Sequence, residues 1–558
     1  MYCGDETGSF IGDIGSHTSR FGYGGEDNPK FVAPSYTVQC QDNNSTTSTC
    51  SSIPSSCYSG RLASQNVRPI LRMPWLGEED QQFAAPQIDP NAYLPQGDGV
   101  QDWDAHEQLW LRSLELLRVT DTLKHTKGGT PYTPNNVTSS STIHSNTTNK
   151  TGARCVHPIL AVTPGMTYRT GQVGEQYAAA VQREQHTKLV EFLMETVDAP
   201  ACFLAPTPML SAFCFGRQTA LVVDVGAGGC RVTPVVDGLL LKHAQRRNGR
   251  GGDWLGNVQW RALLEQKVVL RPRYQLRNAI SALATKSPYF YRWAMQDLLY
   301  EFRTSSNHCK LAQWCDDETV PFLWSTSNSG TENKNNNNAQ SSDEEEDDDE
   351  EEEGDDAKKE GGIKPTPMET EEEEDDNDKK SDHDDDDTSK SVQAAGMTYE
   401  LPDGTHIDLS SKMGHDLCRI PELLFTDEVP YVMHETSRTG IMSEHHTLSN
   451  LPLHQLVFSS LSAVGDGDLR KDLAANIILT GGSSLFPNMA ERLSMEVPRV
   501  VPSNYKCRVI ASRNSVERSC SAWVGASILT SLGSFQQLWL SRNEYQEYGA
   551  ALAIQRFP

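Results

Sequence analysis

The chain has 558 residues, of which 37% are hydrophobic, so a globular core spread over roughly two to four domains is expected. Its formal net charge is −26. Residues 343–387 hold 27 acidic side chains against 5 lysines and so contribute −22 of that charge. The remainder carries 48 acidic and 44 basic residues and is close to neutral. No basic face is indicated, and we expect no direct sequence-specific binding of nucleic acid.

The sequence also argues against a membrane or secreted protein. It contains no run of about 18 apolar residues, so we expect no membrane-spanning helix. The first ten residues, MYCGDETGSF, lack the basic start and the apolar run of a secretory leader. The 13 cysteines form no C-x-x-C pair, which favours reduced thiols in an intracellular protein.

Patterned segments predict alternating strands and helices. In chain order they are a strand–turn–strand unit at 9–25, a helix at 104–119 with Trp110, Leu114 and Leu117 on one stripe, a second strand–turn–strand unit at 220–236, a helix at 291–302, a strand at 476–480, and helices at 489–497 and 522–532. This order predicts an α/β fold.

Three polar segments interrupt this pattern. Residues 37–69 and 124–152 are rich in Ser, Thr and Asn, and residues 325–396 run from Asn-rich sequence into the acidic block. None holds enough apolar surface to offset the entropy of ordering it, so we expect disordered insertions.

The two strand–turn–strand units share an Asp-x-Gly motif, Asp13-Ile14-Gly15 and Asp224-Val225-Gly226. Glycine lets a turn direct its N–H groups at an anion, and each aspartate would lie beside a magnesium ion or its waters. A third glycine turn at 480–484 follows a predicted strand and could lie against a base or a sugar. Each motif alone is usually a plain turn, whereas two such clamps facing each other would make a nucleotide site.

The segments GDETGSFIGDIGSHTSRFGYGG, HPILAVTP, TALVVDVGAGG, YELPDGT, RIPELLF, NIILTGGSSLFPNMAERL and SAWVGASILTSLGSFQQLWL resemble successive landmarks of the actin family. The N-terminal segment and the acidic insertion are similar to the nuclear branch of that family. The resemblance implies an actin-like ATPase fold of two lobes and four subdomains around a cleft that holds ATP and Mg²⁺. It assigns 1–36, 98–214 and 521–558 to subdomain 1, 37–97 to subdomain 2, 215–248 and 434–520 to subdomain 3, and 249–433 to subdomain 4.

Carried onto this sequence, the resemblance gives a set of cofactor-binding residues. The phosphate loops would be Asp13, Gly15, Ser16 and His17 in the first unit and Asp224, Gly226 and Gly228 in the second. The adenosine would lie against Gly481, Gly482, Ser483 and Phe486. Asp13 and Asp224 would hold Mg²⁺ through water.

The departures from the family pattern bear on activity. Actin orients its attacking water with a glutamine, an aspartate and a histidine, and these positions are Thr207, Ala227 and Arg231 here. Loss of a water-orienting group typically removes orders of magnitude in rate. Arg20 replaces a phosphate-loop lysine with retention of charge, and Ser519 replaces a lysine near the base. We therefore expect a structural ATP, negligible hydrolysis and no catalytic residue.

Three functions compete. The resemblance implies a nuclear subunit of chromatin-remodelling and histone-acetyltransferase complexes that pairs with actin on a helical scaffold region of a larger subunit. A filament-forming cytoskeletal actin is disfavoured, because insertions at 37–97 and 325–396 would repel or obstruct neighbouring protomers. A sugar kinase on the same scaffold would need a carboxylate base where the second loop has Ala227. The acidic block either solubilises the chain or attracts basic histones.

Overall fold

The computed structural model describes residues 8–41, 47–50, 68–72, 100, 102–121, 154–165, 172–276, 288–305, 398–409, 411–426 and 451–557. These residues belong to one compact unit. Among them, no helix has both the length and the apolar character needed to span a bilayer. The predicted insertions at 124–152 and 325–396 lie outside the described residues.

The first of two large sheets has the strand order β19-β10-β9-β1-β2-β3. Its members are β1 (Phe10–Ile14), β2 (Thr18–Tyr23), β3 (Phe31–Pro34), β9 (Ile159–Thr163), β10 (Ala201–Pro206) and β19 (Leu540–Ser541). The strand β1 is antiparallel to β2 and parallel to β9, and β9 is parallel to β10. A hairpin therefore continues into parallel strands, as an α/β chain allows.

The second sheet repeats this plan, with the order β13-β12-β11-β17-β18 and with β14 also paired to β12. Its members are β11 (Ala220–Val225), β12 (Cys230–Val236), β13 (Leu239–Leu240), β14 (Arg246–Asn248), β17 (Ile477–Thr480) and β18 (Val509–Ile510). Here β11 is antiparallel to β12 and parallel to β17. Both predicted strand–turn–strand units are thus confirmed as hairpins at corresponding places in two mixed sheets, and the predicted α/β class is confirmed.

Helices cover both faces of each sheet. The α-helices of the described residues are α3 (Trp103–Leu116), α4 (Gln172–Glu191), α5 (Thr207–Cys214), α6 (Gly252–Glu265), α7 (Arg273–Leu276), α9 (Pro288–Thr304), α11 (Lys412–Arg419), α13 (Leu453–Ala463), α14 (Gly467–Ala475), α15 (Met489–Val500), α16 (Ser515–Ser519), α17 (Ser521–Thr530), α18 (Arg542–Tyr548) and α19 (Ala550–Arg556). On the first sheet, α3, α4 and α19 share one core cluster, and α5 and α17 share another.

The helix α3 shows how sequence specifies this packing. Its first turn is capped by the Asp102 carboxylate, which accepts a hydrogen bond from the Ala105 N–H at 3.0 Å, as an N-cap aspartate should. Trp110 and Leu114 are 1% exposed, and Leu117 is partly buried in the same cluster. The Trp110 ring lies over Gly12 of β1, where a Cβ atom would lie 2.2 Å from it. The bare glycine therefore lets the helix approach the sheet closely.

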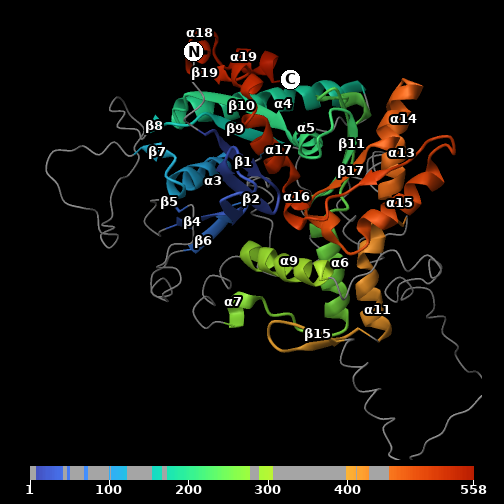
Figure 1. The fold of residues 1–558 in the computed structure, drawn as a ribbon. Coiled ribbons are helices and arrows are strands. Elements are labelled where there is room, and N and C mark those ends of the chain that lie inside the picture. The colour runs from blue at the N-terminus through green and yellow to red at the C-terminus, as the bar shows by residue number, and fades with distance from the viewer. Residues whose placement is uncertain are drawn as a thin grey trace, which may run out of the picture. The chain divides into compact units, whose positions relative to one another are not determined.

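The two sheets meet at α5 and α17, which lie side by side in Figure 1. Residues of β11 alternate between two cores, as a strand buried on both faces must. Leu221, Val223 and Val225 join the large cluster with α6, α9, α13 and α15, whereas Ala220 and Val222 pack with Ala212 of α5. Since α5 and α17 both pack on the first sheet, α5 contributes to the cores of both sheets, and α17 packs against it.

The segment 37–69 differs in part from the expectation. The strands β4 (Thr37–Gln41), β5 (Thr47–Cys50) and β6 (Arg68–Arg72) form a three-stranded antiparallel sheet, with β4 in the centre. Thr and Val favour strands, and the pairing of Thr37 with Arg72 links ends that are far apart in the sequence. The remaining short strands are β7 (Thr120–Asp121), β8 (Arg154–Cys155), β15 (Thr398–Glu400) and β16 (His406–Asp408). The subdomain boundaries stay predictions.

Candidate nucleotide site

The hairpin turns of the two sheets provide the first part of the site. After β1, the Gly15 N–H donates to the Thr18 carbonyl at 3.2 Å, and after β11 the Gly226 N–H donates to the Gly229 carbonyl at 3.1 Å. Gly229 has φ +148°, and a Cβ atom there would lie 2.3 Å from the Asn248 carbonyl oxygen. The second turn therefore requires glycine at this position.

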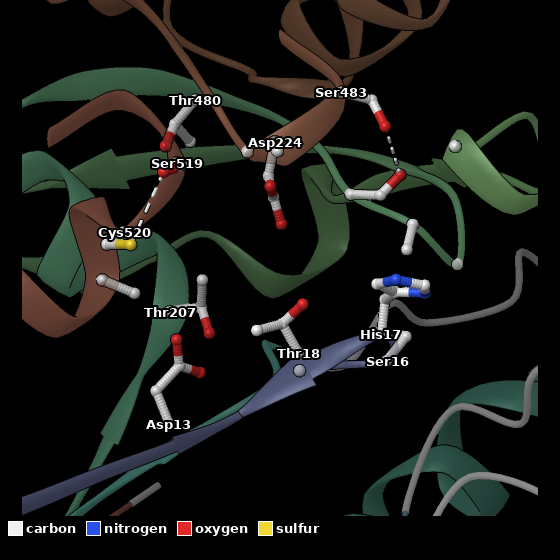
Figure 2. Close-up of a pocket in the computed structure, with 18 of the residues that line it drawn as sticks. Asp13, Ser16, His17, Thr18, Thr207, Asp224, Thr480, Ser483, Ser519 and Cys520 are labelled. Carbon is white, nitrogen blue, oxygen red and sulfur yellow. Dashed lines mark hydrogen bonds between the residues drawn. The ribbon is translucent and has the colours of Figure 1, made fainter. Parts of the chain in front are cut away.

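A cavity of about 360 Å³ lies between these turns. Figure 2 shows Asp13 and Asp224 directed into the same space from opposite sides. The cavity brings together all but one of the predicted site residues: Asp13, Gly15, Ser16, His17, Asp224, Gly226, Gly228, Gly481, Gly482 and Ser483. Motifs from three distant parts of the chain thus line one cavity, as the sequence predicts.

Phe486 is the exception. It is 1% exposed and belongs to the core of the second sheet, and it is not among the residues that line the cavity. The guanidinium of Arg303 lies over its ring, 6.0 Å from the centroid. Arg303 is equally buried and lines the cavity. Phe486 thus packs in the core behind this wall, and its contact with adenosine stays a prediction.

The third glycine turn closes the site against α9. Gly481 has φ +98°, and a Cβ atom there would lie 2.5 Å from Oδ1 of Asp224. The Tyr300 hydroxyl donates to the Gly482 carbonyl at 3.0 Å. The Ser483 hydroxyl lies 3.4 Å from the Gly226 carbonyl, a link between the third turn and the second that Figure 2 also shows. Bare backbone and small hydroxyls therefore face the cavity here.

Sequence reasoning missed the contribution of α9. Gln296, Tyr300 and Arg303 all line the cavity, and their spacing of four and three residues places them on one helix face. Arg303 donates to the Gln259 side chain at 2.8 Å and to the Gly252 carbonyl at 3.1 Å. The signal was present as a polar stripe within YRWAMQDLLYEFR, but nothing in the stripe itself says which cavity it faces.

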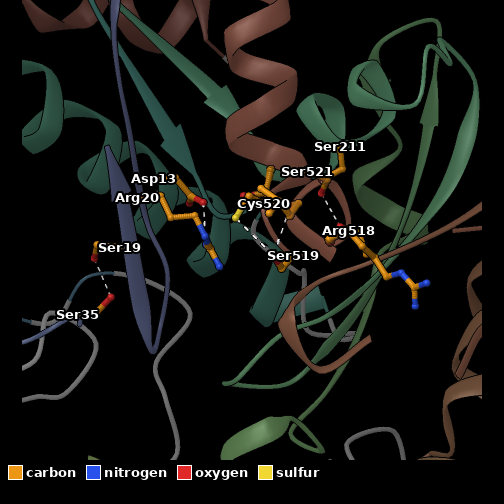
Figure 3. A network of polar contacts seen from close by, with 12 residues as sticks. Asp13, Ser19, Arg20, Ser35, Ser211, Arg518, Ser519, Cys520 and Ser521 are labelled. Carbon is orange, nitrogen blue, oxygen red and sulfur yellow. Dashed lines mark hydrogen bonds and ion pairs between the residues drawn. The ribbon is translucent and has the colours of Figure 1, made fainter. Parts of the chain in front are cut away.

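Small polar side chains join α5, β17 and α17 at the inner end of the cavity. The Ser211 and Ser521 hydroxyls lie 2.9 Å apart, and Ser521 also contacts the Thr480 hydroxyl. Thr480 donates to the Arg518 carbonyl at 2.8 Å. Figure 3 shows Ser211, Ser519, Cys520 and Ser521 in this region. The hydrogen bonds couple the cavity wall to the junction between the sheets.

The two aspartates lie in different electrostatic surroundings. Nη1 of Arg20 is 3.1 Å from Oδ2 of Asp13 (Figure 3). Burial raises the pKa of Asp13, and the Arg20 charge opposes that rise. Burial raises the pKa of Asp224 to about 6, and the charge of Arg231 opposes this. Desolvation dominates at both carboxyls, because little water reaches them.

The three positions that would orient an attacking water all line the cavity: Thr207, Ala227 and Arg231. The Thr207 hydroxyl already donates to the Thr163 carbonyl at 3.1 Å. Ala227 has no polar side chain, and a guanidinium is a poor base because it stays protonated. None of the three side chains can therefore act as the base that takes a proton from water.

Comparison with known proteins settles the family. The family model described as Actin matches residues 4–558 of the chain. The chain belongs to the actin family. It is 27% identical over 567 residues to Actin-related protein 4 of Oryza sativa subsp. indica and 26% identical over 564 residues to that of Arabidopsis thaliana, with the full length of both chains covered in each case. It is 25% identical over 564 residues to Actin-related protein 4 of Saccharomyces cerevisiae, covering 98% of this chain and 96% of the yeast protein.

The predicted family is therefore confirmed, and the similarity extends over at least 96% of the length of each of these relatives. The cavity of this actin-family chain lies where the resemblance places the nucleotide, between the two Asp-x-Gly hairpins and the third glycine turn. What differs from the expected pattern is the charged lining, in which arginines face both aspartates.

Proposed function

We propose that this actin-family chain is a non-catalytic subunit of nuclear chromatin-remodelling and histone-acetyltransferase complexes, and that it binds ATP as a structural ligand. The observation that carries the proposal is the combination found in one cavity. The glycine turns that could hold phosphates are present, while Thr207, Ala227 and Arg231 supply no base for water. Phosphoryl transfer depends on positioning and charge stabilisation, so binding can persist where turnover is lost.

We propose that the cavity binds the nucleotide without the magnesium ion that the sequence resemblance implies. Asp13, one of the two carboxylates expected to hold the ion through water, is already paired with Arg20. Asp224 lies in register with Arg231 on the neighbouring strand. In nucleotide sites Mg²⁺ is held by one or two carboxylates together with the phosphates. Both carboxylates here already face a guanidinium, so they are poorly suited to a divalent ion.

The first prediction concerns the nucleotide. A ligand that binds only the folded state stabilises it, by about 2.7 kcal/mol at a concentration of 100 times Kd. ATP should therefore raise the melting temperature of the purified chain, and equilibrium dialysis should find about one nucleotide per chain. A chain that neither shifts its melting temperature nor retains nucleotide would contradict the proposal. The matched ligand control is adenosine without phosphates.

The second prediction concerns partners, for which we propose actin, a helical scaffold region of a larger subunit, and histones. Residues 343–387 lie outside the described residues, but their net charge of −22 would attract basic tails and raise association rates at low salt. Deleting 343–387 should abolish the salt-sensitive part of histone binding in a pull-down series from low to high salt. The control is deletion of 124–152, a polar segment without an acidic block. Unchanged histone binding would mean that the block only solubilises the chain.

A further inference from the structure

Besides the Asp-x-Gly motif, the two hairpins share a pair of oppositely charged residues. Asp13 of β1 lies directly across the ladder from Arg20 of β2, and Asp224 of β11 lies directly across from Arg231 of β12. Side chains directly opposite on antiparallel strands project to the same face, and all four residues line the cavity. Each hairpin therefore presents one carboxylate and one guanidinium to the same space.

The two guanidiniums differ in their partners. Arg20 donates to the Asp13 carboxylate at 3.1 Å. In the part of the chain that the structure describes, no side chain or carbonyl accepts a hydrogen bond from the Arg231 guanidinium. Arg231 is partly buried, and a guanidinium has five N–H donors that need acceptors. Its place at the cavity wall therefore calls for an acceptor of negative charge.

The charges of the lining point to the same kind of ligand. Its ionisable carboxylates belong to Asp13, Asp224 and Asp253, and its guanidiniums to Arg20, Arg231 and Arg303. Three positive and three negative charges make the lining neutral, so the protein itself adds no net attraction for a divalent cation. Guanidiniums and backbone N–H groups are instead the usual ligands of phosphate oxygens, and arginine can contact two oxygens at once.

We propose that Arg231 and Arg20 hold the phosphates of a nucleoside triphosphate as a free anion, so that binding does not require a divalent cation. This inference rests on the proposed function, because it concerns the same cavity and the same nucleotide. The glycine turns at 226–229 and 481–482 supply backbone groups, and the two arginines supply the positive charge that a metal ion would otherwise bring.

The test is a titration of the full chain with ATP by isothermal calorimetry, once with excess Mg²⁺ and once with excess EDTA. The dissociation constants should agree within tenfold. A tenfold or greater weakening in EDTA overturns the metal-independent site and leaves the proposed function intact. Absence of binding in both buffers overturns the proposed function and this inference together.

Variants test the role of Arg231 in the same EDTA buffer. Arg231→Gln should weaken ATP binding at least tenfold, and Arg231→Lys should recover part of that loss because it restores the charge. The control is Arg217→Gln, which changes an exposed arginine outside the cavity lining. Circular dichroism checks that each variant is folded. A folded Arg231→Gln chain that binds ATP as tightly as the unaltered protein would overturn the assignment, whatever the outcome of the EDTA titration.

Discussion

Replacing Gly251 with alanine should lower ATP affinity at least tenfold and destabilise the fold by roughly 3 kcal/mol, the upper part of the usual range for overpacking. A Cβ atom at this position would lie 2.2 Å from the Gly229 nitrogen, 2.3 Å from the Ala227 oxygen and 2.8 Å from the Gly226 oxygen. All three atoms belong to the backbone of the second hairpin turn, which cannot rotate away as a side chain could.

The second hairpin turn, which the new Cβ atom would displace, is also held by hydrogen bonds from the start of α6. The Gly252 N–H donates to the Gly226 carbonyl at 2.9 Å, and the Asp253 N–H donates to the Ala227 carbonyl at 3.0 Å. Gly251 itself has φ −104°, a value that any residue adopts. Alanine would therefore introduce no backbone strain, and the loss of stability and affinity would come from the steric overlap of its Cβ atom.

Two measurements check this prediction, calorimetric titration with ATP and chemical unfolding. The control is Gly465→Ala, since a Cβ atom there meets nothing within 4 Å and a change within about 0.5 kcal/mol is expected. If Gly251→Ala binds ATP with unaltered affinity, the second turn does not contact the nucleotide and the placement of the phosphates is wrong.

Replacing Gly525 with alanine should cost roughly 2–3 kcal/mol of unfolding free energy. This residue lies in the middle of α17, where alanine would ordinarily gain about 1 kcal/mol of helix propensity over glycine. A Cβ atom there, however, would lie 1.9 Å from the Leu210 carbonyl oxygen and 2.6 Å from its carbonyl carbon. We expect the steric overlap with the backbone of α5 to outweigh the gain in helix propensity. The sign of the change in unfolding free energy shows which of the two dominates.

The effect should reach beyond the helix pair, because α5, against which α17 packs, contributes to the cores of both sheets. Urea unfolding followed by circular dichroism measures the change in free energy. Gly533→Ala is the matched control, because a Cβ atom at that glycine also meets nothing within 4 Å. A Gly525→Ala chain at least as stable as the unaltered protein would show that the helices do not approach as closely as described.

The local features of the site could be predicted because they are encoded within short segments. The Asp-x-Gly turns stand between apolar runs, and the two hairpins follow from that alternation. The helix with Trp110 and Leu114 follows from their spacing of four residues. The third glycine turn could be placed because it separates a buried strand from an amphipathic helix.

The features that escaped prediction depend on contacts between distant segments. Gly251 and Gly525 look like ordinary glycines until the opposing backbones of Ala227 and Leu210 are in place. The Arg303 guanidinium of α9 lies over the ring of Phe486, a contact between residues 183 positions apart. The pairing of β4 with β6 is likewise non-local. Period and composition carry no information about such contacts.

We propose above all that the cavity binds ATP without hydrolysing it. A multiple-turnover assay of released inorganic phosphate is the direct test. Purified protein is loaded with ATP, its bound nucleotide is quantified, and phosphate release is followed with a fluorescent phosphate sensor. We expect about one bound ATP per chain and less than about one phosphate released per chain in an hour. Steady release of phosphate over many turnovers by the loaded protein would contradict it.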